Sequence, residues 1–211
     1  KAGMPRPQPA GRATAGSGDK VVYFPTCAGR MFGADTPEAA LSATVIRVLE
    51  RAGYAPIVPD GVDALCCGQS FASKGLALEA DRKSAELEAA LRRASDNGRY
   101  PIVLDASACT LRMKTFLAER LPVFDLVEFA HDALLPRLML QKKSEPVLLH
   151  LNCSARRMGF DAKLNALARA SPRPFGEPRP RLAIRPVGAA KPSSPPRSSA
   201  IGPPPTSADA L

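Results

Sequence analysis

Short apolar runs alternate along residues 20–170 with segments whose apolar positions recur at the period of a helix. Apolar runs bounded by Gly, Pro, Asn or Asp predict strands, and the periodic segments predict helices. The predicted strands are residues 21–24, 55–58, 101–104, 123–124 and 147–151. The predicted helices are a segment that begins at Thr36 as cap and ends near Gly53, then residues 73–95, 111–119, 127–135 and 162–170.

Strands that alternate with crossover helices predict an α/β fold with a largely parallel sheet. In such sheets, sites form in the loops beyond the carboxyl ends of the strands. Cys27, Cys109 and Cys153 each follow a predicted strand within a few residues, and the pair Cys66-Cys67 follows the second strand after a longer loop. We therefore expect all five cysteines at one edge of the sheet.

The adjacent cysteines Cys66-Cys67, followed by Gly68, indicate a metal site. A disulfide between neighbouring residues is strained, whereas cysteine thiolates suit iron–sulfur clusters, Zn and Cu(I). Ligands spread from Cys27 to Cys109, rather than packed in two CxxC knuckles, disfavour a zinc ribbon. The alternative is that Cys27 and Cys109 are small buried core residues, since free cysteine is often buried.

The two ends of the chain differ in composition from its centre. Residues 1–19 are rich in Pro, Gly and Ala and predict a flexible linker. Residues 171–211 hold 11 of the 22 prolines and show almost no apolar periodicity, which predicts a disordered tail. The chain begins at Lys1 rather than Met, which indicates a fragment or a trimmed product.

Charge and composition exclude several classes of protein. The net charge of +9 lies mostly in the Pro-rich ends, and residues 21–170 carry 19 basic and 17 acidic residues. A nucleic-acid binder concentrates basic residues on a folded face, so the sequence predicts no nucleic-acid partner. No apolar run is long enough to span a membrane, and no signal peptide is present. Five cysteines including an adjacent pair favour a reducing compartment over a disulfide framework.

Residues 22–31 have a near copy in residues 148–158. In both, an apolar run leads to Cys, then small residues, then Arg and Met. This predicts a duplicated unit whose second copy begins near Pro146. Cys66 lies 39 residues after Cys27, yet the position 39 residues after Cys153 is Pro192 and no cysteine follows Cys153. We therefore predict a complete unit over 20–145, the start of a second over 146–170, and a tail that replaced the rest through truncation or a frameshift.

Other polar residues near the cysteines have two interpretations each. Asp105 follows a predicted strand and is a turn former or a group that supports the site. The arginines Arg30, Arg156 and Arg157 neutralise an anionic cluster or lie in solvent. The two histidines, His131 and His150, are expected to be structural.

The chain resembles the cysteine-rich CCG domain family over residues 20–170. The segments VVYFPTCAGRM, LERAGYAPIVPDGVDALCCGQSFASKG, ELEAALRRASDNGRYPIV and HLNCSARRMG carry the likeness. The family includes the heterodisulfide reductase B subunit and the iron–sulfur subunit of glycolate oxidase. The likeness is greatest to the C-terminal part of bacterial FAD-linked, iron–sulfur D-lactate dehydrogenases.

The resemblance implies a site for an iron–sulfur cluster of the 4Fe-4S type. It implies that Cys27, Cys66, Cys67 and Cys109 are the ligands of the first copy and that Cys153 opens the second. The family's third motif is CxxC, but here it is Ala106-Ser107-Ala108-Cys109. One family cysteine is therefore replaced by Ala106, and a five-cysteine site cannot form.

The function implied by the resemblance is a C-terminal electron-transfer module of an FAD-linked 2-hydroxy-acid dehydrogenase, with D-lactate the favoured substrate. FAD would lie in an N-terminal domain that this chain lacks, so the fragment alone is expected to be inactive. The implied partners are FAD-binding and ferredoxin-type domains and a quinone or cytochrome acceptor. The implied location is the cytoplasm, including the inner face of the membrane. Two alternatives stay open: a stand-alone CCG subunit of heterodisulfide-reductase or glycolate-oxidase type, and a non-catalytic docking domain.

Overall fold

A computed structural model describes residues 17–32, 34–140 and 149–170 of the chain. The chain divides into two compact units, residues 1–175 and 176–211, and every described residue belongs to the first. The linker predicted over 1–19 and the tail predicted over 171–211 lie almost wholly outside the described residues. Among the described residues, no helix is long and apolar enough to cross a membrane.

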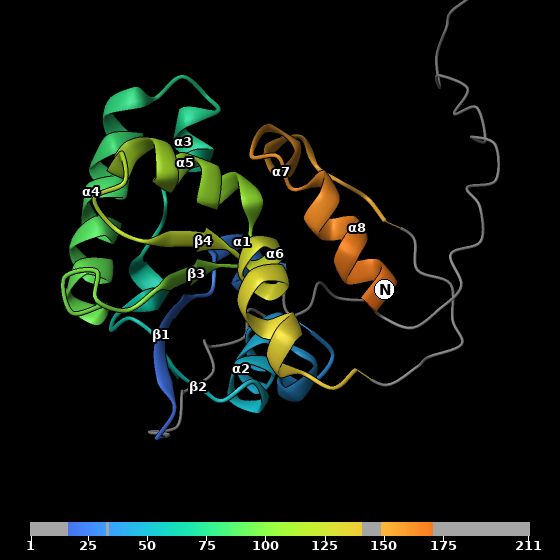
Figure 1. Cartoon of the computed structure of the whole chain (residues 1–211). Coiled ribbons are helices and arrows are strands. Elements are labelled where there is room, and N and C mark those ends of the chain that lie inside the picture. Colours follow the sequence, from blue (N-terminus) through green and yellow to red (C-terminus); the bar gives the residue numbers. More distant parts are fainter. Residues whose placement is uncertain (1–16, 33, 141–148, 171–211) are drawn as a thin grey trace, which may run out of the picture. The chain divides into compact units, whose positions relative to one another are not determined.

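Four parallel strands form the centre of the fold (Figure 1). They are β1 (Asp19–Phe24), β2 (Tyr54–Ile57), β3 (Ile102–Leu104) and β4 (Val123–Asp125). Their order in the sheet is β2-β1-β3-β4, and every neighbouring pair is parallel. Val22 lies beside Ile57 of β2 on one side and beside Ile102 of β3 on the other. The predicted α/β fold with a largely parallel sheet is therefore confirmed.

Helices connect the strands and cover both faces of the sheet. The α-helices are α1 (Cys27–Phe32), α2 (Leu41–Arg51), α3 (Gln69–Ala72), α4 (Ala77–Ala94), α5 (Ser107–Leu117), α6 (Leu126–Phe129), α7 (Cys153–Arg157) and α8 (Asp161–Ala170). The shorter turns are the 3-10 segments η1 (Pro37–Ala39), η2 (Val62–Ala64) and η4 (Leu135–Arg137), and the π-helical segment η3 (Ala130–Leu134).

The alternation of side chains along β1 divides the core into two layers. Val22 and Phe24 pack on one face against α4 and α5, and Val21 and Tyr23 pack on the other against α2 and η3. All four side chains are fully buried. Because β1 is buried on both faces, it reads in the sequence as a continuous apolar run rather than as an alternating one.

Two predicted elements differ from the structure. Thr36 caps only the 3-10 turn η1, by accepting a hydrogen bond from the Ala39 N–H at 3.3 Å, and α2 begins separately at Leu41. The strand predicted over 147–151 lies partly outside the described residues, and residues 149–151 form no strand. No neighbouring strand of the described sheet pairs with residues 149–151, and an apolar run without a partner strand does not form a ladder.

Helices α7 and α8 belong to the same compact unit as the sheet. Helix α7 packs against α5, and α8 packs against η3 and α6. Ala155 and Phe160 are the buried anchors of this hairpin, and the Lys114 amino group lies 5.8 Å from the centre of the Phe160 ring. The residues assigned to the start of a second unit therefore contribute to the cover of the first.

Candidate functional site

The strand order creates a switch point between β1 and β3 at the carboxyl edge of the sheet. The chain leaves β1 through α2 on one face to reach β2, and returns through α4 on the other face to reach β3. Connections that depart to opposite faces leave a crevice beyond the two central strands, where ligands of such folds bind. Cys27 begins α1 directly after β1, and Cys109 lies in the first turn of α5 after β3. The fold thus places these two cysteines on either side of the switch point.

The loop that follows β2 brings two further cysteines to the switch point. Cys66 and Cys67 lie between η2 and α3, and the thiols of Cys27, Cys66, Cys67 and Cys109 interact with one another. Hydrogen bonds link Cys27 with Cys66, Cys66 with Cys67, and Cys67 with Cys109. Cys67 and Cys109 are buried, whereas Cys27 and Cys66 are partly exposed. Four thiols from three loops therefore form one group, which we call the four-cysteine site.

The pKa is lowered at Cys67 and raised at Cys27 and Cys109. The hydrogen bond with Cys109 lowers the pKa of Cys67 to about 7, and the backbone N–H of Gln69 supports the Cys67 thiolate as well. The same hydrogen bond raises the pKa of Cys109, and burial raises it further. Burial also raises the pKa of Cys27, with Cys66 and Cys67 adding to the effect. The thiolate form is therefore favoured at Cys67 over Cys109, which acts as the donor of the pair.

The Cys-Cys-Gly turn is fixed against helix α4. Gly68 has a φ of 81°, and a Cβ there would lie 2.2 Å from the carbonyl oxygen of Ala80. A side chain at this position is therefore excluded both by the backbone conformation and by the neighbouring helix. The buried Ser84 hydroxyl lies 2.9 Å from the carbonyl oxygens of both Cys67 and Ala80 and donates to this pair of acceptors. The Gly68 N–H donates to the Cys66 sulfur at 3.4 Å.

Asp105 ties the loop after β1 to the loop after β3. Its carboxylate accepts hydrogen bonds from the Tyr23 hydroxyl at 2.7 Å and from the Thr26 N–H at 2.9 Å. Burial raises the pKa of Tyr23, and the Asp105 charge raises it further, so the phenol stays a donor. Of the two interpretations of Asp105, the structure supports a group that fixes the site.

Thr26, directly before Cys27, has a fully buried side chain whose hydroxyl has no hydrogen-bond partner among the residues that the structure describes. A buried polar atom without a partner is costly and typically marks a place where a ligand or water belongs. Its position at the switch point, next to one of the four thiols, makes it a candidate donor to an acceptor bound there.

The arginines that follow the cysteine loops have different surroundings. The Arg30 side chain is 9 % exposed and forms hydrogen bonds with the loop that precedes Cys66. Arg156 and Arg157 are exposed. The charge-neutralising role is therefore open to Arg30, and the solvent-exposed interpretation applies to the other two. The pattern of the sequence could not separate them, because all three follow a cysteine at similar spacing.

Cys153 and the two histidines have more open surroundings than the buried cysteines. Cys153 is exposed at the start of α7. His131 pairs with Asp132 at 2.6 Å, and His150 is exposed. The expectation that Cys153 joins the other four cysteines at one edge of the sheet stays a prediction.

The donor set of the site is rich in sulfur. Within residues 17–32, 34–140 and 149–170, no three Cys, His, Asp or Glu side chains are arranged to hold one metal ion. Thiolates that bind different iron atoms of a cluster need not converge on one point, and iron–sulfur clusters are held by four such ligands. The partly buried Ala106, where the resembling family has a cysteine, packs against the core. Four soft donors, an orphaned hydroxyl and a buried cation fit an anionic cluster.

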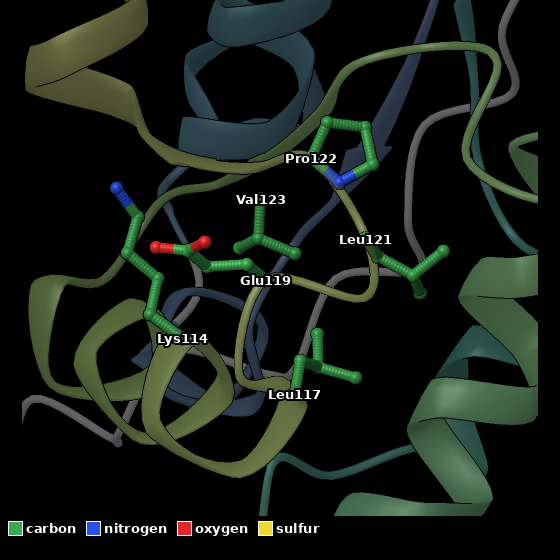
Figure 2. A pocket seen from close by; sticks show the side chains of 6 residues that line it. All are labelled: Lys114, Leu117, Glu119, Leu121, Pro122 and Val123. Atoms are coloured by element: carbon green, nitrogen blue, oxygen red, sulfur yellow. The ribbon is translucent and has the colours of Figure 1, made fainter.

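A hollow lies between the end of α5 and the start of β4 (Figure 2). Its volume is about 340 Å³, and Figure 2 shows its lining residues Lys114, Leu117, Glu119, Leu121, Pro122 and Val123. The Lys114 amino group is already paired with Glu128 at 2.6 Å. No cysteine lines this hollow, so it is separate from the four-cysteine site.

Comparison of the chain with family models, with curated proteins and with solved structures gives no match. The four-cysteine site therefore rests on the geometry of this chain.

Proposed function

We propose that this chain is an iron–sulfur electron-transfer module whose cluster is held by Cys27, Cys66, Cys67 and Cys109. The observation that carries the proposal is the placement of four cysteines from three separate loops at the switch point of the sheet, where the pKa values of Cys27, Cys67 and Cys109 respond to the neighbouring thiols. A structural role for small buried cysteines does not require such proximity. Four thiols also match the ligand number of common clusters.

The residues around the thiols have defined roles in this proposal. The Gly68 N–H already donates to the Cys66 sulfur, and the Gln69 N–H supports the Cys67 thiolate. Hydrogen bonds to ligand sulfurs favour the thiolate form and stabilise negative charge at the site. The Thr26 hydroxyl supplies a further donor that has no acceptor in the described part of the chain. When bound, an iron–sulfur cluster accepts and releases single electrons.

The wider function that we propose comes from the sequence resemblance. The segments around Cys27, Cys66-Cys67 and Cys153 resemble FAD-linked, iron–sulfur 2-hydroxy-acid dehydrogenases, with D-lactate the favoured substrate. In such an enzyme the module would pass electrons from FAD-binding and ferredoxin-type domains towards a quinone or a cytochrome. We place it in the cytoplasm, including the inner face of the membrane.

Thiol chemistry is the second candidate function. The direct hydrogen bond between Cys67 and Cys109, with Cys67 as thiolate, resembles a reactive dithiol pair. A dithiol is oxidised to a disulfide with release of two protons and two electrons to an acceptor. This matches a stand-alone subunit of the heterodisulfide-reductase type.

One experiment separates the two functions. The purified chain is incubated anaerobically with Fe²⁺, sulfide and a thiol reductant, and the iron and sulfide retained after desalting are measured together with the EPR spectrum of the reduced sample. We expect close to stoichiometric loading of one cluster and a signal that disappears on oxidation. Retention of no iron, combined with rapid formation of a Cys67–Cys109 disulfide by mild oxidant, would favour thiol chemistry instead.

A further inference from the structure

We infer that Arg30 is a positioning residue of the four-cysteine site: its guanidinium aligns the loop of Cys27 with the loop of Cys66 and Cys67, and its charge offsets that of the bound group. The inference rests on the proposed function and deepens it. It begins from the burial of Arg30: its side chain is 9 % exposed, whereas the next residue, Met31, is 66 % exposed. Arginine is rarely buried unless its donors are satisfied.

Every contact of the guanidinium joins the two cysteine loops. Its Nε donates to the carbonyl oxygen of Pro25, two residues before Cys27, at 3.1 Å. Its Nη2 donates to the carbonyl oxygen of Leu65, directly before Cys66, at 2.9 Å. Its Nη1 lies 3.2 Å from a carboxylate oxygen of Asp63. The planar fork of arginine suits such a bridge, because its donors are fixed relative to one another.

The charge of Arg30 is only weakly offset by its own partner. The Asp63 side chain is 74 % exposed, so water screens it, while the guanidinium lies in the protein. The positive charge of Arg30 therefore still acts on the thiols, and at Cys27 it opposes the rise in pKa that burial causes. A cluster with four thiolate ligands is anionic and becomes more so on reduction, so a buried cation beside it favours the reduced form.

The chain contains a matched position for control. Arg156 follows Cys153 by three residues, as Arg30 follows Cys27. Both arginines lie in short helices, Arg156 in α7 and Arg30 in α1. The Arg156 side chain, however, is 71 % exposed, and its ion pair with Asp161 is long, at 3.9 Å. An effect of losing any arginine from such a helix would appear at both positions, whereas a role in the site would appear only at Arg30.

The test compares wild type, Arg30→Lys, Arg30→Met and Arg156→Met after loading with Fe²⁺ and sulfide. We expect Arg30→Met to lose iron to a chelator about 10- to 100-fold faster than wild type, the range typical for groups that orient metal ligands. Its midpoint potential should be more negative, because a positive charge is removed. Arg30→Lys should also lose iron faster, since lysine lacks the fork, but should keep a potential near that of wild type. Arg156→Met should match wild type in both measurements.

Hydrogen exchange of the metal-free proteins gives a readout that is independent of the cluster. We expect Arg30→Met to exchange faster in both loops, residues 25–30 and 62–68, while Arg156→Met leaves them unchanged. Equal exchange, iron retention and potential in the Arg30 and Arg156 variants would overturn the inference. Unfolding of both Arg30 variants would overturn it as well, since Arg30 would then be a residue of the fold. A wild type that takes up no iron contradicts the proposed function, and the exchange measurement still decides the role of Arg30.

Discussion

Cys27 and Cys153 occupy the same place in two copies of one local structure. Each is the first residue of a short helix, α1 or α7. In each, the carbonyl oxygen of the preceding residue accepts a hydrogen bond of 3.1 Å from the N–H of the arginine that follows the cysteine by three residues. The sequence repeat is therefore matched by a repeat of backbone geometry.

The surroundings of the two cysteines differ in every respect that matters for metal binding. Cys27 follows the central strand β1, so loops from β2 and β3 lie on both sides of it. Cys153 follows residues 149–152, which form no strand, and its side chain is exposed. The local motif thus places a cysteine at a helix start, and the sheet decides which other cysteine loops lie near it.

The largest expected effect is on iron loading when cysteines of the two regions are replaced. Cys67→Ser should lose most of the iron that wild type retains, because a buried ligand at the centre of the thiol group is removed. Cys153→Ser should load like wild type. Iron and sulfide are measured per chain after anaerobic loading. Full iron in Cys67→Ser, or loss of iron in Cys153→Ser, would contradict the assignment of the site.

The next largest effect is on the free energy of unfolding when one of two carboxylates is removed: Asp105, which binds the loop before Cys27, or Asp161, which pairs with Arg156. Asp105→Ala should lower the free energy of unfolding by roughly 2–4 kcal/mol, because it leaves the buried Tyr23 hydroxyl and the Thr26 N–H without their acceptor. Asp161→Ala, whose partner Arg156 is exposed, should cost at most about 1 kcal/mol. Urea unfolding of the metal-free variants measures both. Similar losses in the two variants would show that the loops are equally fixed.

The smallest expected effect is on stability, and it has opposite signs at Thr26 and Asn152, the residues that precede Cys27 and Cys153. The Asn152 side chain accepts a hydrogen bond from the Ala155 N–H at 2.9 Å, so Asn152→Ala should destabilise by about 1 kcal/mol. The Thr26 hydroxyl has no partner, so Thr26→Val should stabilise the metal-free protein by about 1 kcal/mol. Thermal unfolding without metal checks both signs. A Thr26→Val variant that is less stable than wild type would mean that the hydroxyl has a partner in solution.

The sequence was sufficient to predict the α/β class and the positions of Cys27 and Cys109 after strands. Strand β1 contains the run Val21, Val22, Tyr23 and Phe24, which is typical of a strand that is buried on both faces. Its next residues, Pro25 and Thr26, end the strand and place Cys27 just beyond its carboxyl end. These predictions depend on local periodicity and on turn residues, which a single sequence records.

Tertiary structure alone decided which residues meet at the site. The sequence repeat gave Cys153 the same pattern as Cys27, and it gave Arg30 the same pattern as Arg156. Strand order decided between them, because β1 lies between β2 and β3 while residues 149–151 pair with no strand of the described sheet. Burial of Arg30 requires carbonyl acceptors from a loop 35 residues away, and the orphaned hydroxyl of Thr26 is defined by what surrounds it. Local sequence thus determined that Cys27 and Cys109 lie in the first turns of helices just beyond their strands, and the packing of distant loops determined which cysteines lie close to one another.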